Sequence, residues 1–173
     1  MRHTSNQMQE STSNRPLVTF ALFAYNQENY IREAVNGAFA QTYEPLEIIL
    51  SDDDSSDQTF AIMQQLAADY NGPHQVRVRK SEHNLGLAGH VNEVFSISKG
   101  AIIILAAGDD ISLPRRSQIT AALFEEFPNV SAVLLSADLI EKDGNIIGRR
   151  LMSNIKDKQT LQTLKDLTRG NHM

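Results

Sequence analysis

The sequence predicts an α/β fold with a mostly parallel, doubly wound sheet. Apolar segments of strand length alternate with amphipathic segments of helical period, and glycine, proline and asparagine separate them. This alternation favours parallel strands joined by right-handed crossovers. The length of 173 residues suits one domain with a single hydrophobic core.

Five segments have the composition of strands. Residues 101–107 are seven consecutive apolar residues, which is typical of a strand buried on both faces of a parallel sheet. Residues 75–79 alternate polar and apolar side chains and predict a less buried edge strand. Residues 142–145 predict a hairpin turn after the last strand. The other expected strands are residues 17–24, 46–50 and 130–135.

Helical segments are expected between these strands. Asn26 is a suitable N-cap for the first helix, and Ser112 with Pro114 marks the start of the fourth. Another short helix is expected within residues 156–169. The apolar sides of the first four helices are Ile31, Ala34, Val35, Ala38 and Phe39; Phe60, Met63, Leu66, Ala67 and Tyr70; Val91, Val94 and Phe95; and Ile119, Leu123 and Phe127.

The composition argues against several classes of protein. A net charge of −5 disfavours a nucleic-acid binder that relies on a basic face. The absence of cysteine excludes disulfides and thiolate metal sites. No apolar run approaches the roughly 20 residues of a membrane span, and residues 1–15 are polar, lack a signal-peptide core and are expected to be a disordered leader. We expect a cytoplasmic protein, with a position at the inner face of the membrane left open.

Aspartate clusters follow two of the expected strands. Asp52, Asp53 and Asp54 follow the second strand, and Asp109 and Asp110 follow the run 101–107 after a glycine. Because the carboxyl ends of parallel strands meet at one edge, both clusters are expected to face a common crevice. Carboxylates without cysteine or paired histidine favour Mg²⁺ or Mn²⁺, shared with a substrate phosphate. The alternative is a solvated turn that caps the next helix.

Five motifs in this order give the chain a recognisable pattern. They are the first strand running into Tyr25-Asn26, the loop 52–59, Asn84-Leu85-Gly86 followed by Asn92, Lys99-Gly100 before a buried strand, and Gly108-Asp109-Asp110. The pattern resembles the inverting family 2 glycosyltransferases. The resemblance implies a GT-A, Rossmann-like nucleotide-diphospho-sugar transferase fold and a hexosyltransferase-type activity in polysaccharide or glycoconjugate biosynthesis.

The resemblance also implies roles for individual residues. Asp53 with Asp52 would bind the base of a nucleoside diphosphate sugar. Asp109 would hold a divalent cation, Mg²⁺ or Mn²⁺, at the diphosphate, where the charge of the leaving group develops. Asp110 and His90 would lie beside the donor sugar and diphosphate. The rest of the nucleotide pocket would be lined by Ala24, Asn26, Glu28, Asn84 and Gly86.

Three positions depart from the family pattern. Asp54 replaces the usual glycine and adds a charge to an acidic loop. Ala107 stands where many members have the first aspartate of Asp-x-Asp, which leaves the metal to Asp109. His90-Val91 stands where many members have Ala-Arg, so a cation near the phosphates is missing unless His90 replaces it. The alternative for His90 is a solvated cap at a helix start.

An inverting transferase also needs a general base to deprotonate the acceptor hydroxyl. No carboxylate after Asp110 lies in a segment that matches the family's base motif, and Asp138, at the end of the strand expected at 130–135, is the weak candidate. We therefore expect residues 16–150 to form the donor-binding domain of a longer enzyme. Residues 151–173 are expected to be a helical extension, the truncated start of the acceptor-side region.

The expected partners are a nucleoside-diphosphate sugar, a carbohydrate or lipid-linked acceptor and a second copy of the chain, with no nucleic acid. A receiver-like Mg²⁺-binding signalling domain is an alternative, because residues 47–54 resemble its acidic pocket, but a complete strand–helix unit precedes them. A nucleotidyltransferase would need a glycine-rich basic loop after the first strand, and Tyr25–Glu28 is not one. A non-catalytic nucleotide-sugar-binding module is the third alternative.

Overall fold

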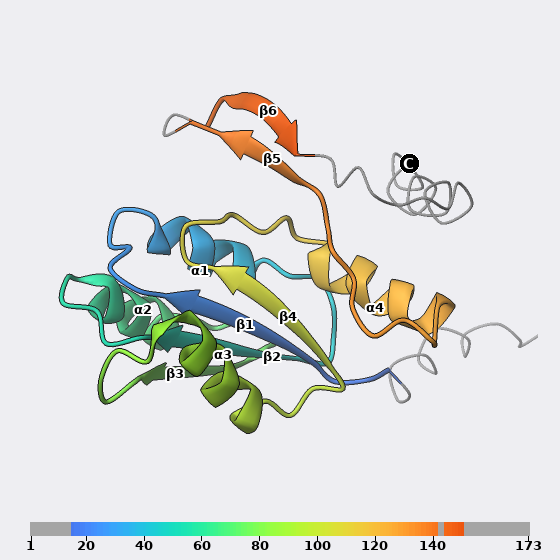
Figure 1. Cartoon of the computed structure of the whole chain (residues 1–173), viewed down its shortest axis with the longest axis horizontal. Coiled ribbons are helices and arrows are strands. Elements are labelled where there is room, and N and C mark those ends of the chain that lie inside the picture. The colour runs from blue at the N-terminus through green and yellow to red at the C-terminus, as the bar shows by residue number, and fades with distance from the viewer. Residues whose placement is uncertain (1–14, 142–143, 151–173) are drawn as a thin grey trace, which may run out of the picture. The chain divides into compact units, whose positions relative to one another are not determined.

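A computed structural model of the chain confirms the α/β fold with a parallel sheet (Figure 1). The structure describes residues 15–141 and 144–150. The elements run β1 (Val18–Ala24), α1 (Ile31–Phe39), β2 (Leu46–Asp52), α2 (Thr59–Ala68), β3 (Gln75–Lys80), α3 (Gly86–Ile97), β4 (Ile102–Ala107), α4 (Arg116–Glu126), β5 (Ala137–Ile140) and β6 (Ile146–Arg150). No helix among these residues is long and apolar enough to cross a membrane.

The first four strands form one parallel sheet in the order β3-β2-β1-β4. The chain builds β1, β2 and β3 outward in one direction and then returns to place β4 on the other side of β1. The register pairs Ala24 with Asp52 and Phe23 with Ala107, so the strands end together at one edge. A reversal of strand order beside β1 is the place where open α/β sheets bind ligands.

The side chains of β1 and β2 supply the core of this unit. Ala21 and Ile49 are buried against Val94 of α3. Because side chains alternate across a strand, Phe20 and Ile48 point to the other face, and both are fully buried. Helices α1 and α2 contact each other and pack against β1 and β2 (Figure 1). The prediction of a buried strand at residues 17–24 is confirmed as β1.

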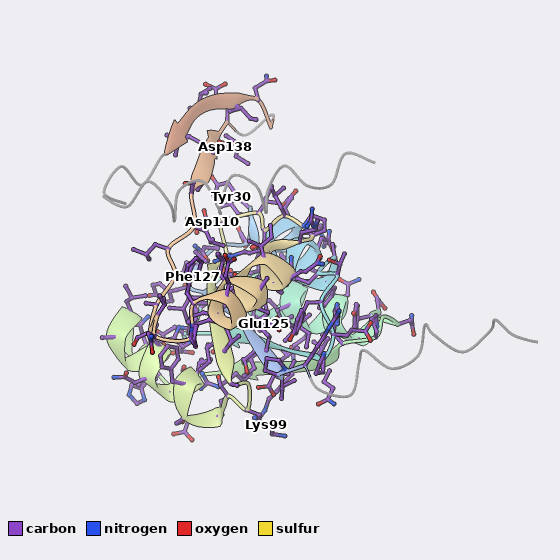
Figure 2. All side chains as sticks on the ribbon, turned by 90° about the vertical axis from the view of Figure 1, so that its right-hand side faces the viewer. Tyr30, Lys99, Asp110, Glu125, Phe127 and Asp138 are labelled. Atoms are coloured by element: carbon purple, nitrogen blue, oxygen red, sulfur yellow. The ribbon has the colours of Figure 1, made fainter. Side chains whose placement is uncertain are left out.

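The end of the sheet opposite the aspartates explains the Lys99-Gly100 motif. Glu47 Oε1 accepts a hydrogen bond from the backbone N–H of Lys99 at 2.6 Å and another from Thr19 Oγ1, also at 2.6 Å. A Cβ at residue 100 would collide with the backbone nitrogen of Thr19, so only glycine fits there. Lys99 and Asp110 lie at opposite ends of β4 (Figure 2). The motif therefore fixes the start of β4 against β1.

One strand is less buried than its sequence predicts. Residues 101–107 predict burial on both faces, but Leu105 of β4 is 45% exposed. The physical reason is position, because β4 is an edge strand of the described sheet and no further described strand pairs with it. The edge strand expected at residues 75–79 is confirmed as β3, at the other edge.

Several predicted helix boundaries are wrong. Helix α1 begins at Ile31, and Asn26 lies outside it with a φ of 51°. Helix α3 begins at Gly86, so the last residue of the Asn84-Leu85-Gly86 motif is already helical. Helix α4 begins at Arg116 rather than beside Ser112, whose hydroxyl accepts a hydrogen bond from Arg116 Nη1 at 2.8 Å. In each case side-chain hydrogen bonds hold the loop before the helix in a non-helical conformation.

The chain divides into two compact units, up to Ala121 and from Ala122 onward. The strand expected at residues 130–135 does not form, and β5 begins two residues later. Strands β5 and β6 pair antiparallel, which confirms the predicted hairpin, with the backbone N–H of Gly144 donating to the carbonyl of Glu141. The leader at 1–14 and the extension at 151–173 lie outside the described residues, and the expected domain boundary at 150 stays a prediction.

Candidate functional site

The structure brings the ends of β1, β2 and β4 together at one edge of the sheet. The backbone N–H of Asp53 donates to the carbonyl of Ala24 at 2.9 Å, and the N–H of Gly108 donates to the carbonyl of Phe23 at 2.8 Å. Both bonds continue the parallel ladders beyond the last paired residues of the strands. The two predicted aspartate clusters therefore follow strands that flank β1.

Asp53 links the end of β2 to the start of α3. Its side chain is buried, with the residue 3% exposed, and Oδ1 accepts a hydrogen bond from the backbone N–H of Leu85 at 3.0 Å. Asn84 Nδ2 donates to the carbonyl of Asp53 at 3.1 Å. No donor contacts Oδ2 among the described residues, and this oxygen is not enclosed. This oxygen keeps its capacity to accept a further hydrogen bond.

Asp52 has a different environment from its neighbour. It is fully buried, and Ser55 occupies both of its carboxylate oxygens, through its backbone N–H on Oδ2 at 2.9 Å and its hydroxyl on Oδ1. A carboxylate that accepts such local bonds stabilises the turn that contains it. The geometry therefore gives Asp52 a role in shaping the loop, because Ser55 uses both of its carboxylate oxygens.

Asn26 and Glu28 join the loop after β1 to the loop after β2. Asn26 Oδ1 accepts from the backbone N–H of Ser56 at 2.9 Å, and its own N–H donates to Ser55 Oγ at 2.8 Å. Glu28 Oε2 accepts from the N–H of Gln58 at 3.0 Å, while the N–H of Glu28 donates to Asp57 Oδ2 at 3.1 Å. These reciprocal hydrogen bonds hold the loop after β1 against the loop after β2.

The pKa of Asp57 reflects these contacts. Burial favours its neutral form, but hydrogen bonds from the hydroxyl and N–H of Thr59 and from the N–H of Glu28 outweigh burial and hold the pKa of Asp57 below its ordinary value. The charged form is thus the one that the loop stabilises. Asp57 contributes to the shape of the acidic loop at neutral pH.

Asp54, the departure from the family's usual glycine, takes a backbone conformation that glycine favours. Its φ is 62°, in the left-handed region that aspartate tolerates better than most residues. Lys80 Nζ lies 3.2 Å from Asp54 Oδ1 and donates to the carbonyl of Ser55 at 2.9 Å. The added charge is therefore paired with a lysine from the end of β3.

Asp109 and Asp110 form an exposed turn immediately after β4. The N–H of Asp110 donates to the carbonyl of Ala107 at 3.1 Å. The described residues contain no group of three or more histidine, cysteine or carboxylate side chains that could hold a metal. Two adjacent carboxylates still suit a hard cation that takes its remaining ligands from water and a diphosphate.

Arg116 distinguishes the two aspartates. It donates to the carbonyl of Leu105 and lies with its guanidinium 5.7 Å from the ring centre of Phe20. Burial lowers the pKa of Arg116, and the negative charge of Asp110 opposes that effect. Asp110 thus lies within electrostatic range of the Arg116 guanidinium. The sequence reasoning missed Arg116, because its only signal was a basic residue near the start of α4.

Gln27 is a second residue that the sequence reasoning missed. Its Oε1 is buried without a hydrogen-bond partner among the described residues. The carboxamide lies against Gly108, where a Cβ would collide with Oε1, so a larger residue before the aspartate pair would displace the Gln27 side chain. An unmatched buried acceptor costs about 1–3 kcal/mol. No motif in the sequence signalled this contact.

The remaining predicted residues lie in two different environments. His90 is buried, with Nε2 2.6 Å from Ser51 Oγ, so it is not the solvated cap considered from the sequence. Its expected contact with the donor stays a prediction. Gly86 has a φ of 68°, and its backbone N–H donates a hydrogen bond to Asn84 Oδ1 at 3.1 Å. Asp138 lies within β5, not at the end of the strand expected at 130–135, and belongs to the second unit.

Sequence comparisons identify relatives of the chain. EpsE of Bacillus subtilis (strain 168) is 29% identical over 142 residues, which cover 82% of this chain and 50% of EpsE. The hyaluronan synthase of Pasteurella multocida is 30% identical over 141 residues, or 81% of this chain and 14% of the synthase. The chain thus spans half the length of EpsE and a smaller share of the synthase.

A solved structure and a family match complete the comparison. The structure of the mannosyltransferase PcManGT from Pyrobaculum calidifontis, in complex with GDP-Man and Mn²⁺, superposes with a TM-score of 0.58 at 20% identity, covering 75% of this chain and 37% of that one. This likeness shows a GT-A fold. The family described as "Glycosyl transferase family 2" matches residues 19–172. The chain belongs to that family of glycosyltransferases.

Proposed function

We propose that this chain binds a nucleoside-diphosphate sugar and transfers its sugar, with inversion, to an acceptor hydroxyl in polysaccharide or glycoconjugate biosynthesis. The single observation that carries the proposal is the position of Asp53. At the edge of the sheet where β1 and β4 end, its backbone is bonded to Ala24 and its Oδ1 to Leu85, while its Oδ2 accepts no hydrogen bond from the described residues. Asp109 and Asp110 follow the strand on the other side of β1.

Asp53 is the residue that would recognise the base. A carboxylate only accepts hydrogen bonds, so it selects a ring N–H of the nucleotide. A hydrogen bond to a charged group contributes about 1.5–3 kcal/mol. Asp52, Asn26 and Glu28 would support this recognition by holding the two loops in place, and Ala24, Asn84 and Gly86 would line the same pocket.

Asp109 would hold a divalent cation at the diphosphate, with Asp110 beside it. The cation would stabilise the negative charge on the leaving diphosphate. The carboxylates of both residues are exposed after β4, and Arg116 lies near Asp110. The choice between Mg²⁺ and Mn²⁺ is part of the experiment below. The mannosyltransferase relative with GDP-Man and Mn²⁺ supports a metal in a site of this fold.

The transfer itself needs groups beyond this site. The acceptor oxygen attacks the anomeric carbon, the bond from that carbon to the diphosphate oxygen breaks with its electron pair leaving on the diphosphate, and the hydroxyl proton passes to a general base. We assign no described residue to that base, and Asp138 stays the weak candidate. The hyaluronan synthase relative supports a carbohydrate acceptor, with a lipid-linked one as the alternative.

Calorimetric titration with UDP, GDP and dTDP, each with and without Mn²⁺ or Mg²⁺, tests the donor site. We expect one nucleotide to bind, and the divalent cation to tighten that binding. Failure of all three nucleotides to bind in either condition would contradict the proposal. A transfer assay with the matching nucleotide sugar then distinguishes an enzyme from a non-catalytic binding module.

A further inference from the structure

His90 occupies the contact between α3 and the end of β2. The residue is 3% exposed, and its Nε2 lies 2.6 Å from Ser51 Oγ. The ring meets that of Phe23 edge to face, with the ring centres 5.1 Å apart. Ser51 directly precedes the acidic loop. His90 therefore contacts, from inside the protein, the strand that directly precedes Asp53.

Ser51 also connects His90 to an ion pair. Arg79 Nη1 donates to Ser51 Oγ at 2.8 Å, and Arg79 Nη2 lies 2.6 Å from Glu93 Oε2. A guanidinium can only donate, so the hydroxyl accepts from Arg79 and has its own hydrogen for His90. With the Ser51 hydrogen directed at Nε2, this arrangement suits a neutral imidazole that carries its hydrogen on Nδ1.

The charges around the ring agree with a neutral imidazole. Burial lowers the pKa of His90; Asp53 opposes this, Arg79 adds to it, and Glu93 and Asp52 oppose it more weakly. These four charged groups face the ring from β2, β3 and α3, and Phe23 of β1 contributes no charge. The lowered pKa of His90 means that the neutral form dominates at neutral pH.

Residues within α3 and just before it hold the end of β2 and the residue after it at three points. His90 bonds Ser51, the N–H of Leu85 bonds Asp53 Oδ1, and Asn84 Nδ2 bonds the carbonyl of Asp53. Protonated His90 would need to donate to a hydroxyl that already accepts from Arg79. Two cationic donors would then share one oxygen, and we expect their repulsion to weaken the contact between α3 and β2.

We propose that neutral His90 is a positioning residue, which holds Asp53 in place for the nucleotide base by fixing α3 to Ser51. The proposal rests on the proposed function for the role of Asp53, but its structural part can be measured without any ligand. It assigns His90 a position behind the nucleotide site and not a contact with the phosphates.

Two substitutions of His90 separate the hydrogen bond from the charge. His90→Gln keeps an acceptor for Ser51 and cannot take a proton in this pH range. His90→Phe keeps a ring but has no acceptor. His83 is exposed in the loop before α3, so His83→Gln is the matched control for the same chemical change. Urea denaturation of each variant would verify that it is folded before comparison.

Hydrogen exchange of the Leu85 N–H is the ligand-free measurement, expressed as a protection factor between pH 8 and pH 5. In the wild type and His83→Gln, we expect protection to fall once the pH drops below the ordinary pKa of His90, by up to about tenfold for each further pH unit above the lowered pKa of the folded protein. His90→Gln should stay protected throughout, and His90→Phe should lose protection at every pH. A pH dependence in His90→Gln equal to that of the wild type would overturn the proposal.

Nucleotide titration over the same pH range tests the link to function. The terminal phosphate of the ligand titrates near a pH of about 6, so the comparison is the difference between wild type and His90→Gln. We expect the wild type to lose more affinity at pH 5 than His90→Gln. Equal losses would overturn the link between His90 and the nucleotide. The predicted exchange pattern without nucleotide binding by any variant would support the positioning of Asp53 and contradict the proposed function.

Discussion

Asp53 and Leu85, 32 residues apart in the sequence, are joined by a 3.0 Å hydrogen bond from the backbone N–H of Leu85 to Asp53 Oδ1. This bond uses one carboxylate oxygen for structure and leaves the other for a ligand. It also ties the acidic loop to the start of α3. The consequences for nucleotide binding and for stability can be measured separately.

Asn84→Ala removes the second tie between α3 and the acidic loop. The side chain donates to the carbonyl of Asp53 at 3.1 Å and accepts from the N–H of Gly86. A hydrogen bond of this kind contributes about 0.5–1.5 kcal/mol, so we expect nucleotide affinity to fall by about 2- to 10-fold in calorimetry. Asn71→Ala, at an exposed asparagine after α2, is the control. Equal effects of the two variants would contradict the account.

Substitutions at Asp54 test whether its backbone conformation matters more than its charge. Asp54→Gly suits the φ of 62° and loses only an ion pair, so the free energy of unfolding should stay within about 1 kcal/mol of the wild type. Asp54→Val places a β-branched residue in the left-handed region and should lower that free energy by about 1–2 kcal/mol. Urea denaturation measures both. A more stable valine variant would contradict the conformational explanation.

The lowered pKa of Asp57 predicts that acid destabilises the loop that contains it. Its folded pKa lies below the ordinary value of 3.8, so its charged form contributes stability that is present above pH 3.8 and is lost as the pH falls through the folded pKa. Asp57→Asn should therefore be less stable than the wild type at neutral pH, and the difference should shrink below pH 3.8. Urea denaturation at several pH values measures it. A difference that does not change with pH would refute this assignment.

Asp109→Ala tests the cation site. We expect the variant to fold like the wild type, because the residue is exposed in a turn, and to bind nucleotide with the same affinity with or without Mn²⁺. Asp69→Ala, at an exposed aspartate after α2, should keep the wild-type response to Mn²⁺. An Asp109→Ala protein that still binds more tightly in Mn²⁺ would remove Asp109 from the metal site.

The sequence predicts the sheet well because its strands are marked by composition. The apolar runs of β1 and β4 and the alternation in β3 each correspond to a strand of the parallel sheet. The prediction that the carboxyl ends of these strands lie at one edge of the sheet followed from their parallel arrangement alone. The prediction failed after α4, where residues 130–135 are apolar enough for a strand but the strand forms at Ala137–Ile140. Apolar composition does not specify pairing, which is decided by contacts distant in the sequence.

The candidate site was predictable only as a set of acidic residues. The sequence could not assign different roles to Asp52 and Asp53. The two adjacent aspartates differ in their hydrogen-bond donors, which are Ser55 for Asp52 and Leu85 for Asp53. The burial of His90 depends on Ser51, 39 residues away. The packing of Gln27 against Gly108 likewise joins the loops after β1 and β4. Such pairs arise from the fold and leave no local pattern.

Nucleotide affinity of Asp53→Asn, compared with Asp69→Asn, tests the central claim most directly. The asparagine Oδ1 can still accept the Leu85 N–H, so the loop is retained, while an amide donor replaces the open carboxylate oxygen. We predict that Asp53→Asn binds the preferred nucleotide about 10- to 100-fold more weakly by calorimetry, with or without Mn²⁺, and that Asp69→Asn binds like the wild type. An unchanged affinity in Asp53→Asn would show that Asp53 does not recognise the base and would contradict the account.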